Sequence, residues 1–188
     1  MKKLGLIVNP IAGMGGAVGL KGTDGAEVLQ RAVELGATPR SLNRTIEALR
    51  PVARELAGVT ILTCAGPMGE SAVTACGLHP TTIHAESSNP ATRQPSNPAT
   101  RERPATSAED TRAAARGMMD EGVDLLLFAG GDGTARDVLM AIGTALPVLG
   151  IPTGVKIHSG VFATTPRAAG ELAVRVLRGQ AVQVREAE

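Results

Sequence analysis

The feature that most constrains the fold of this chain is a glycine-rich turn between an apolar run and a helical pattern. Residues 123–129 form the apolar run, and residues 130–134, with the sequence GGDGT, follow it directly. Residues 135–142 then have apolar side chains at helical spacing. The apolar run is typical of a buried strand, so these segments predict a strand, a glycine turn and a helix.

The composition of this turn indicates a phosphate-binding site. Glycine lets the backbone approach a ligand closely, and the first amides of a following helix have no partner within that helix. Gly130, Gly131, Gly133 and Thr134 would therefore offer backbone N–H groups, and Thr134 also a hydroxyl, to phosphate oxygens. A carboxylate in such a cradle is unfavourable unless it holds a metal ion or accepts a proton from an attacking hydroxyl. Asp132 is therefore the candidate catalytic residue, although aspartate before glycine is also common in tight turns.

The rest of the chain alternates between strand and helix patterns. Apolar runs predict strands at residues 4–8, 59–64, 81–85, 123–129 and 147–151, and allow one more at 181–184. Helical spacing predicts helices at residues 26–35, 42–56, 69–76, 108–119, 135–142 and 166–178. Ser41, Ser107 and Thr165 are the predicted N-caps. This order predicts an α/β fold with a Rossmann-like parallel sheet, helices on both faces and ligands beyond the carboxyl ends of the strands.

Three glycine-rich loops follow predicted strands, at residues 9–25, 130–134 and 150–160, and should meet at the carboxyl edge of the sheet. The chain has four lysines, and two of them, Lys21 and Lys156, lie in these loops. Each could place a compact positive charge on a phosphate or remain a solvated loop residue.

Two further polar residues of these loops are candidates for ligand contacts. Asp24 could hold a metal ion or a ribose hydroxyl. His158 precedes Ser159, but the sequence places no aspartate to complete a catalytic triad. We therefore expect His158 to shape a nucleotide pocket, and the ligands of any metal ion stay unassigned.

Residues 86–105 interrupt the alternating pattern. The sequence SNPATR at residues 88–93 recurs at residues 96–101. This repeat is too short for a solenoid unit, and its proline and polar residues cannot form a core. We expect a flexible surface insert in a single domain over residues 1–188, a length that suffices for one well-buried core.

Charge and composition exclude several partner classes. The net charge of +1 offers no basic footprint for nucleic acid. No apolar run approaches the roughly 20 residues of a membrane helix, so we expect no membrane partner and a cytoplasmic location. Cys64 and Cys76 lack the spacing of metal ligands, so we expect both to be reduced and structural.

The GGDGT sequence at residues 130–134 resembles the signature of NAD kinases and of the superfamily that includes diacylglycerol kinases, sphingosine kinases and, more distantly, 6-phosphofructokinases. Residues 6–25 and 150–162 resemble the branch of ATP- or polyphosphate-dependent NAD kinase-like proteins that includes acetoin-catabolism protein X. The resemblance covers nearly the whole chain outside the insert.

This resemblance implies a reaction and site roles. Asp132 would activate the ribose 2′-hydroxyl of NAD for attack on the terminal phosphoryl group of ATP or polyphosphate, giving NADP. Mg²⁺ or another divalent cation would accompany ATP. Asn9 and Gly13, which form an Asn-Pro-x-x-Gly pattern, would lie beside the nucleotide. An Asx turn that ends the first strand is the alternative interpretation of Asn9.

The resemblance also leaves alternatives. NAD kinases carry an Asn-Glu motif and a β-rich second domain downstream of the matched region, and no such segment follows Val184. We therefore expect an amino-terminal α/β domain without the β-rich domain, which could bind nucleotide without turnover. The alternative functions are a kinase for a lipid or small alcohol and a non-catalytic nucleotide-binding or regulatory module. A homo-oligomer is a further candidate assembly.

Overall fold

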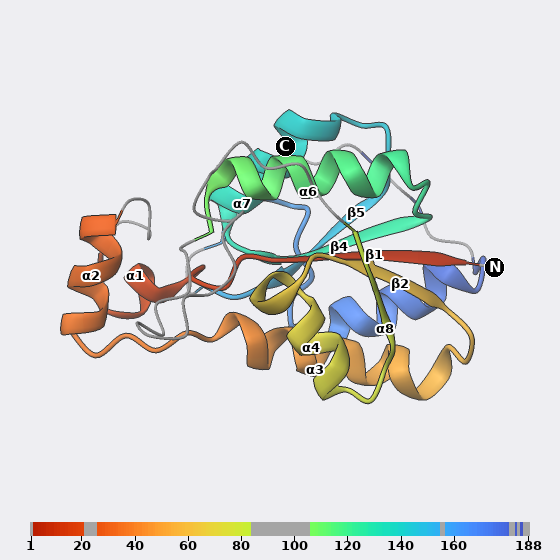
Figure 1. Cartoon of the computed structure of the whole chain (residues 1–188), viewed down its shortest axis with the longest axis horizontal. Helices are drawn as coiled ribbons and strands as arrows, with labels where there is room; N and C mark the ends of the chain where they lie inside the picture. Colours follow the sequence, from red (N-terminus) through yellow and green to blue (C-terminus); the bar gives the residue numbers. More distant parts are fainter. Residues whose placement is uncertain are drawn as a thin grey trace.

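The computed structural model of the chain describes residues 2–20, 26–83, 106–154, 157–180, 183 and 185. Five parallel strands form one sheet in the spatial order β3-β2-β1-β4-β5 (Figure 1). The strands are β1 (Lys3–Val8), β2 (Thr60–Thr63), β3 (Pro80–Thr82), β4 (Leu125–Gly130) and β5 (Val148–Pro152). The predicted α/β class with a parallel sheet is confirmed.

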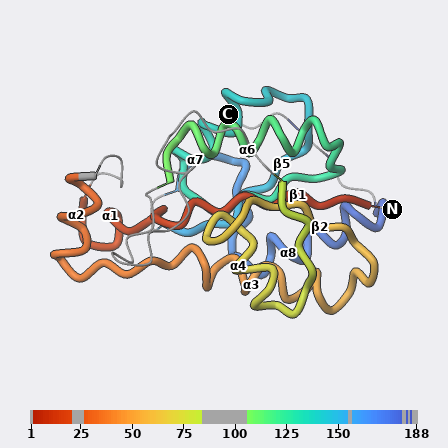
Figure 2. The backbone as a smooth tube through the Cα atoms, viewed as in Figure 1, coloured from red at the N-terminus to blue at the C-terminus, as the bar shows by residue number. Residues whose placement is uncertain are grey.

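Helices connect the strands and cover both faces of the sheet. They are α1 (Met14–Ala17), α2 (Ala26–Glu34), α3 (Ser41–Glu55), α4 (Glu70–Ala75), α6 (Ala108–Asp120), α7 (Asp132–Ile142) and α8 (Pro166–Leu177), with a 3₁₀ helix, η1 (Gly66–Met68), before α4. In Figure 1, α6 and α7 lie above the sheet, and α3, α4 and α8 lie below it. The tube in Figure 2 shows that α1 and α2 extend beyond the carboxyl end of β1.

The sheet separates two apolar cores, because successive side chains of a strand point to opposite faces. In β1, Leu4, Leu6 and Val8 belong to the core that includes side chains of α3 and α8. Ile7 belongs instead to the core on the other face, together with Phe128 of β4 and side chains of α6 and α7. Burial on both faces explains why β1 and β4 are near-continuous apolar runs.

Two of the predicted helix N-caps are confirmed. The Ser107 hydroxyl accepts a hydrogen bond from the Asp110 N–H at 3.3 Å, and the Asp110 carboxylate accepts one from the Ser107 N–H at 2.8 Å. This is a capping box at the start of α6. The Thr165 hydroxyl likewise accepts from the Ala168 N–H at 3.1 Å and caps α8.

The predicted N-cap of α3 and the predicted start of α7 are wrong. Arg40 occupies the N-cap position of α3 without a side-chain cap, and the Ser41 hydroxyl donates to the carbonyl oxygen of Ala12 at 3.4 Å. Ser41 is fully buried, so packing against the loop after β1 takes the place of capping. The helix expected at residues 135–142 begins at Asp132, because part of the glycine turn is already helical.

Some predictions fall on residues that the structure does not describe. These are the insert at residues 86–105 and the strand allowed at residues 181–184, apart from Gln183. Cys64 and Cys76 are both free thiols, and burial raises the pKa of Cys64 to about 11. Among the described residues, no helix has the length and apolar character needed to cross a membrane.

Candidate functional site

The centre of the sheet brings together the carboxyl ends of β1 and β4. The chain places β2 and β3 on one side of β1 and then β4 and β5 on the other, so the order of the strands reverses between β1 and β4. Ligands of open α/β sheets bind at such a reversal, outside the carboxyl ends of the strands. Residues 9–13 and 131–134 leave these two strands, which places two of the predicted loops at this position.

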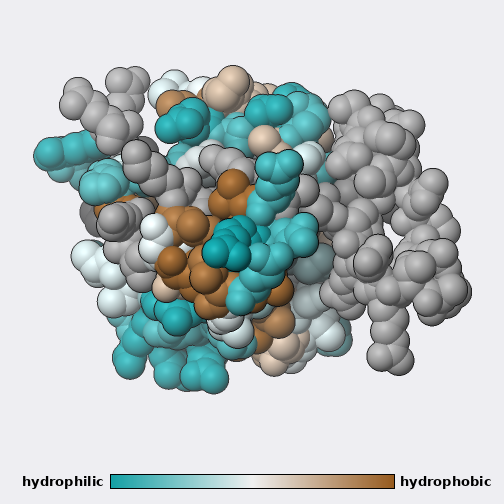
Figure 3. Space-filling view, turned by 90° about the vertical axis from the view of Figure 1, so that its left-hand side faces the viewer, coloured by the Kyte–Doolittle hydropathy of each residue, from teal (hydrophilic) through white to brown (hydrophobic). Residues whose placement is uncertain are grey.

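The surface on this side of the molecule is mixed in character. Figure 3 shows a hydrophobic region near the centre of the face, with hydrophilic residues around it. Val33 near the end of α2 and Leu35 just after it are exposed by 56% and 46%. This face of the molecule is therefore not uniformly polar.

Asn9 links the end of β1 to the start of α7. Its side-chain N–H donates to the Thr134 hydroxyl at 3.1 Å, and its side-chain oxygen accepts from the Ile11 N–H at 3.2 Å. The second contact is that of an Asx turn, so the alternative interpretation of Asn9 is correct for the local geometry. The main-chain N–H of Asn9 also donates to the Ala129 carbonyl at 3.0 Å. The side-chain amide of Asn9 therefore fixes the loop after β1 against the glycine turn.

Gly13 and Thr153 bring the third loop to the same place. Gly13 has a φ of 81°, and a Cβ there would lie 2.6 Å from the carbonyl oxygen of Thr153. The Thr153 hydroxyl donates to the Gly130 carbonyl at 2.8 Å. The loops after β1, β4 and β5 are therefore in contact, as the sequence predicts for loops at the carboxyl ends of parallel strands.

The three glycines of the turn have different surroundings. A Cβ on Gly130 would lie 2.4 Å from the Cβ of Thr134, so the fold itself requires glycine there. A Cβ on Gly131 or Gly133 would have no atom within 4 Å. Gly131 has an extended backbone with φ of −124°, which any residue can adopt. The fold therefore leaves Gly131 and Gly133 open to the outside without needing glycine at either position.

The first turn of α7 offers main-chain donors at this opening. Gly131 is the N-cap and provides no side-chain cap, in contrast to Ser107 of α6 and Thr165 of α8. The first N–H groups of a helix have no partner within it, and the helix dipole adds positive potential there. Only 4% of Thr134 is exposed, and its hydroxyl accepts from Asn9. The main-chain amides, rather than this hydroxyl, are therefore the groups at the open side.

Asp132 is the first residue of α7, and its half-buried carboxylate contacts the loop after β5. The N–H of His158 donates to its two oxygens at 3.1 and 3.3 Å, and the N–H of Ser159 donates to one of them at 3.2 Å. The candidate acidic group is thus held by main-chain amides of a different loop.

The structure does not place every predicted site residue. Lys21, Asp24 and Lys156 lie outside the described residues, and their roles stay predictions. The exposed His158 reaches the site through its main-chain N–H. Sequence reasoning missed Thr153, although a polar residue directly after a buried strand of such a sheet is a usable signal.

The described residues contain no group of three or more His, Cys, Asp or Glu side chains that could hold a metal ion. Asp132 is the carboxylate that the described part of the site offers. Mg²⁺ in nucleotide sites is commonly held by one or two carboxylates together with phosphate oxygens. A single carboxylate therefore fits a cation that arrives with a nucleotide better than a cation held by protein alone.

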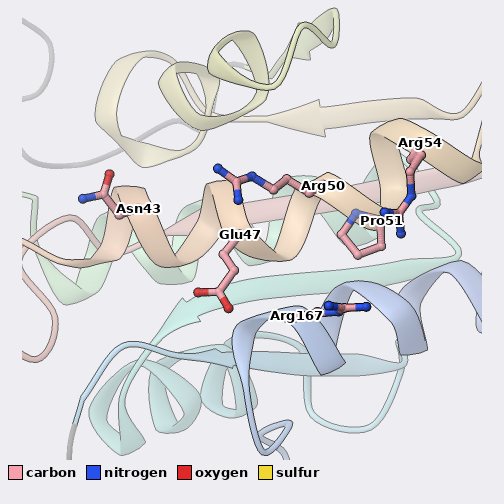
Figure 4. Close-up of a pocket in the computed structure, with 6 residues that line it drawn as sticks. All are labelled: Asn43, Glu47, Arg50, Pro51, Arg54 and Arg167. Carbon is pink, nitrogen blue, oxygen red and sulfur yellow. The ribbon is translucent and has the colours of Figure 1, made fainter.

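A groove of about 510 Å³ lies elsewhere, between α3 and α8 (Figure 4). It is lined by Asn43, Glu47, Arg50, Pro51, Arg54 and Arg167. The Arg167 guanidinium pairs with Glu171 at 2.7 Å, and that of Arg54 lies 3.5 Å from Glu55. These residues are on two helices that cover one face of the sheet, so the groove is not part of the strand-end site.

A model of the family described as ATP-NAD kinase N-terminal domain matches residues 4–181. No match to the chain was found among curated proteins or among solved structures. The matched residues include β1 from Leu4 onward, the other four strands, and the segments that follow β1, β4 and β5. The chain belongs to the family of ATP-NAD kinase N-terminal domains.

Proposed function

We propose that this chain is the phosphate-binding domain of an NAD kinase-like phosphotransferase. The reaction would transfer a phosphoryl group from ATP or polyphosphate to the 2′-hydroxyl of NAD and give NADP. Membership of the ATP-NAD kinase N-terminal domain family supports a kinase function. The geometry of residues 130–134 supports a phosphate-binding site. We also propose that residues 1–188 form one domain, because the two cores share a single sheet.

The open space at Gly131 and Gly133 is the observation that carries this proposal. Glycine in a helix interior is less favourable than alanine by about 1 kcal/mol, and Gly133 lies in the first turn of α7, where glycine is also not the best helix former. Neither packing nor a positive φ explains glycine at position 133, whereas Gly131 is at the N-cap of α7, where glycine is also common. Close approach of a ligand to the main-chain amides does explain it, because a side chain would occupy the space that a phosphate group needs.

The described residues suggest how such a site would work. Phosphate oxygens would accept hydrogen bonds from the first amides of α7, where the helix dipole favours negative charge. A divalent cation bound with the nucleotide would neutralise charge on the phosphates. Asp132 would accept a hydrogen bond from the acceptor hydroxyl and orient it. Phosphoryl transfer passes through a loose transition state, so this orientation matters more than early removal of the proton.

Titration with inorganic tripolyphosphate and with Mg·ATP tests the phosphate site. We expect Gly131→Ala and Gly133→Ala to weaken binding of both ligands at least about tenfold, because each methyl group would block the approach to the amides. Leu139→Ala is the matched control, since Leu139 is an exposed residue of the same helix, 57% exposed. Unchanged affinity in both glycine variants, or equal loss in the control, would contradict the proposal.

A further inference from the structure

The carboxylate of Asp132 is held by main-chain groups of residues 157–160. The donors are the N–H groups of His158 and Ser159, at 3.1 to 3.3 Å from its oxygens. These contacts use no side chain of the 157–160 segment. They also join two segments that leave different strands, β4 and β5.

The 157–160 segment is itself fixed at its far end. The Gly150 N–H donates to the Val161 carbonyl at 2.9 Å, and the Ala163 N–H donates to the Gly150 carbonyl at 3.0 Å. The Phe162 ring lies so close to Gly150 that a Cβ there would be 2.3 Å from its Cδ1 atom. Phe162 also packs edge to face on Phe128 of β4, with ring centroids 5.2 Å apart. The two amides therefore extend from a part of the chain that the sheet holds in place.

These hydrogen bonds restrict the orientation of the carboxylate but do not occupy all of its acceptor positions. A free aspartate side chain at the start of a helix could rotate, whereas donors on both oxygens fix the plane of the group. A carboxylate has about four lone-pair positions, and two N–H groups leave at least one for another donor. Main-chain donors are also neutral, so they do not neutralise its charge.

We propose that the main-chain amides of His158 and Ser159 are positioning groups that set the orientation of the Asp132 carboxylate. Phe162 anchors the chain just after these amides to Gly150 of β5, so it positions the carboxylate indirectly. The proposal rests on the proposed function in one respect, namely that the Asp132 carboxylate orients the acceptor hydroxyl. It adds the 157–160 segment to the site through its backbone rather than through its side chains.

A pair of variants at Ser159 separates the main-chain contact from the side chain. Ser159→Pro removes the N–H donor, and Ser159→Ala keeps it. With ¹³C-labelled aspartate in the ligand-free full chain, we expect Ser159→Pro to move the chemical shift of the Asp132 carboxyl carbon and Ser159→Ala to leave it in place. Equal shifts in both variants, or none in Ser159→Pro, would overturn the proposal.

Amide hydrogen exchange provides an independent measurement, which alone decides if Ser159→Pro does not fold. We expect Asp132→Ala to speed exchange of the His158 and Ser159 amides at least about tenfold, while the amides of β4 stay protected. Asp124→Asn is the matched control, because Asp124 also accepts a main-chain hydrogen bond, from Lys3 at 2.7 Å. Unchanged exchange rates of both amides in Asp132→Ala would overturn the proposal that they hold the Asp132 carboxylate.

These outcomes are separate from those that test the proposed function. Both measurements use the protein without ligand. If the unsubstituted chain fails to bind tripolyphosphate but shows the expected shift and exchange, the phosphate site is wrong and the positioning contact stands.

Discussion

Gly130 and Gly133 belong to the same turn but are glycine for different reasons. Lack of space inside the fold explains Gly130, which lies against Thr134, whereas access from outside explains Gly133. The sequence predicts both as parts of a phosphate-binding turn. It cannot separate them, because the difference depends on where the Thr134 side chain lies once Asn9 has bound its hydroxyl.

Substitution by alanine should change the free energy of unfolding differently at the two glycines. Gly130→Ala should lower the free energy of unfolding by about 1–3 kcal/mol, because the added methyl group must displace the buried Thr134. Gly133→Ala should leave it unchanged or raise it by up to about 1 kcal/mol, since alanine favours the helix. Urea unfolding of both variants measures the difference, and equal destabilisation would show that the surroundings of the two glycines have been assigned wrongly.

Substitution of Asp132 should affect turnover much more than nucleotide binding. We expect Asp132→Asn to lower the rate of NADP formation at least about 100-fold, because the amide presents a weaker acceptor to the attacking hydroxyl. Affinity for Mg·ATP should change only a few-fold, since the amides of α7 remain. A coupled assay for NADP and a titration of Mg·ATP give the two quantities. A rate near that of the unsubstituted protein would rule out the catalytic role of Asp132.

At the scale of elements, periodicity predicts the helices and strands that pack on the sheet. It does not predict α1, because Met14–Ala17 contains two glycines and has the composition of a loop. Packing of Met14 in a small core with Ala32 and Ala37 accompanies this short helix. Ser41 is a second case in which the sequence pattern does not predict the local structure. Its side chain could cap a helix, but it is buried and contacts the loop after β1 instead.

A salt bridge beside the amino ends of β1 and β4 predicts a pH dependence of stability. Hydrogen bonds from the Lys2 ammonium and the Lys3 N–H, both at 2.7 Å, lower the pKa of Asp124 from its ordinary 3.8. A carboxyl group whose pKa is lower in the folded state contributes stability above its unfolded pKa, and this contribution is lost as pH falls through the folded pKa.

Asp124→Asn should therefore reduce stability at neutral pH and have progressively less effect at pH values below about 4. Urea unfolding of both proteins between pH 7 and about pH 2.5 measures this difference. Glu34→Gln is a suitable control, because Glu34 pairs with Arg31 on an exposed face of α2 at 3.1 Å. A constant difference across the whole pH range would contradict the contribution of this salt bridge.

At the scale of the molecule, the meeting of three loops follows from the sheet. Strands that alternate with helices give parallel strands, and the segments after β1, β4 and β5 must then lie at one edge. The sequence could therefore predict the place of the site. It could not predict the contact of Asp132 with His158 and Ser159, because main-chain donors have no signature in the sequence.

The most direct test of a phosphate site at this edge is an NMR titration of the chain with Mg·ATP, followed through its amide resonances. The largest saturable changes should occur at the amides of Gly131, Gly133 and Thr134, which lie at the open start of α7. Smaller changes should occur at Asn9, because its side chain contacts the Thr134 hydroxyl. Changes confined to the α3–α8 groove around Arg50 and Arg167, or no saturable change at all, would contradict a phosphate site between β1 and β4.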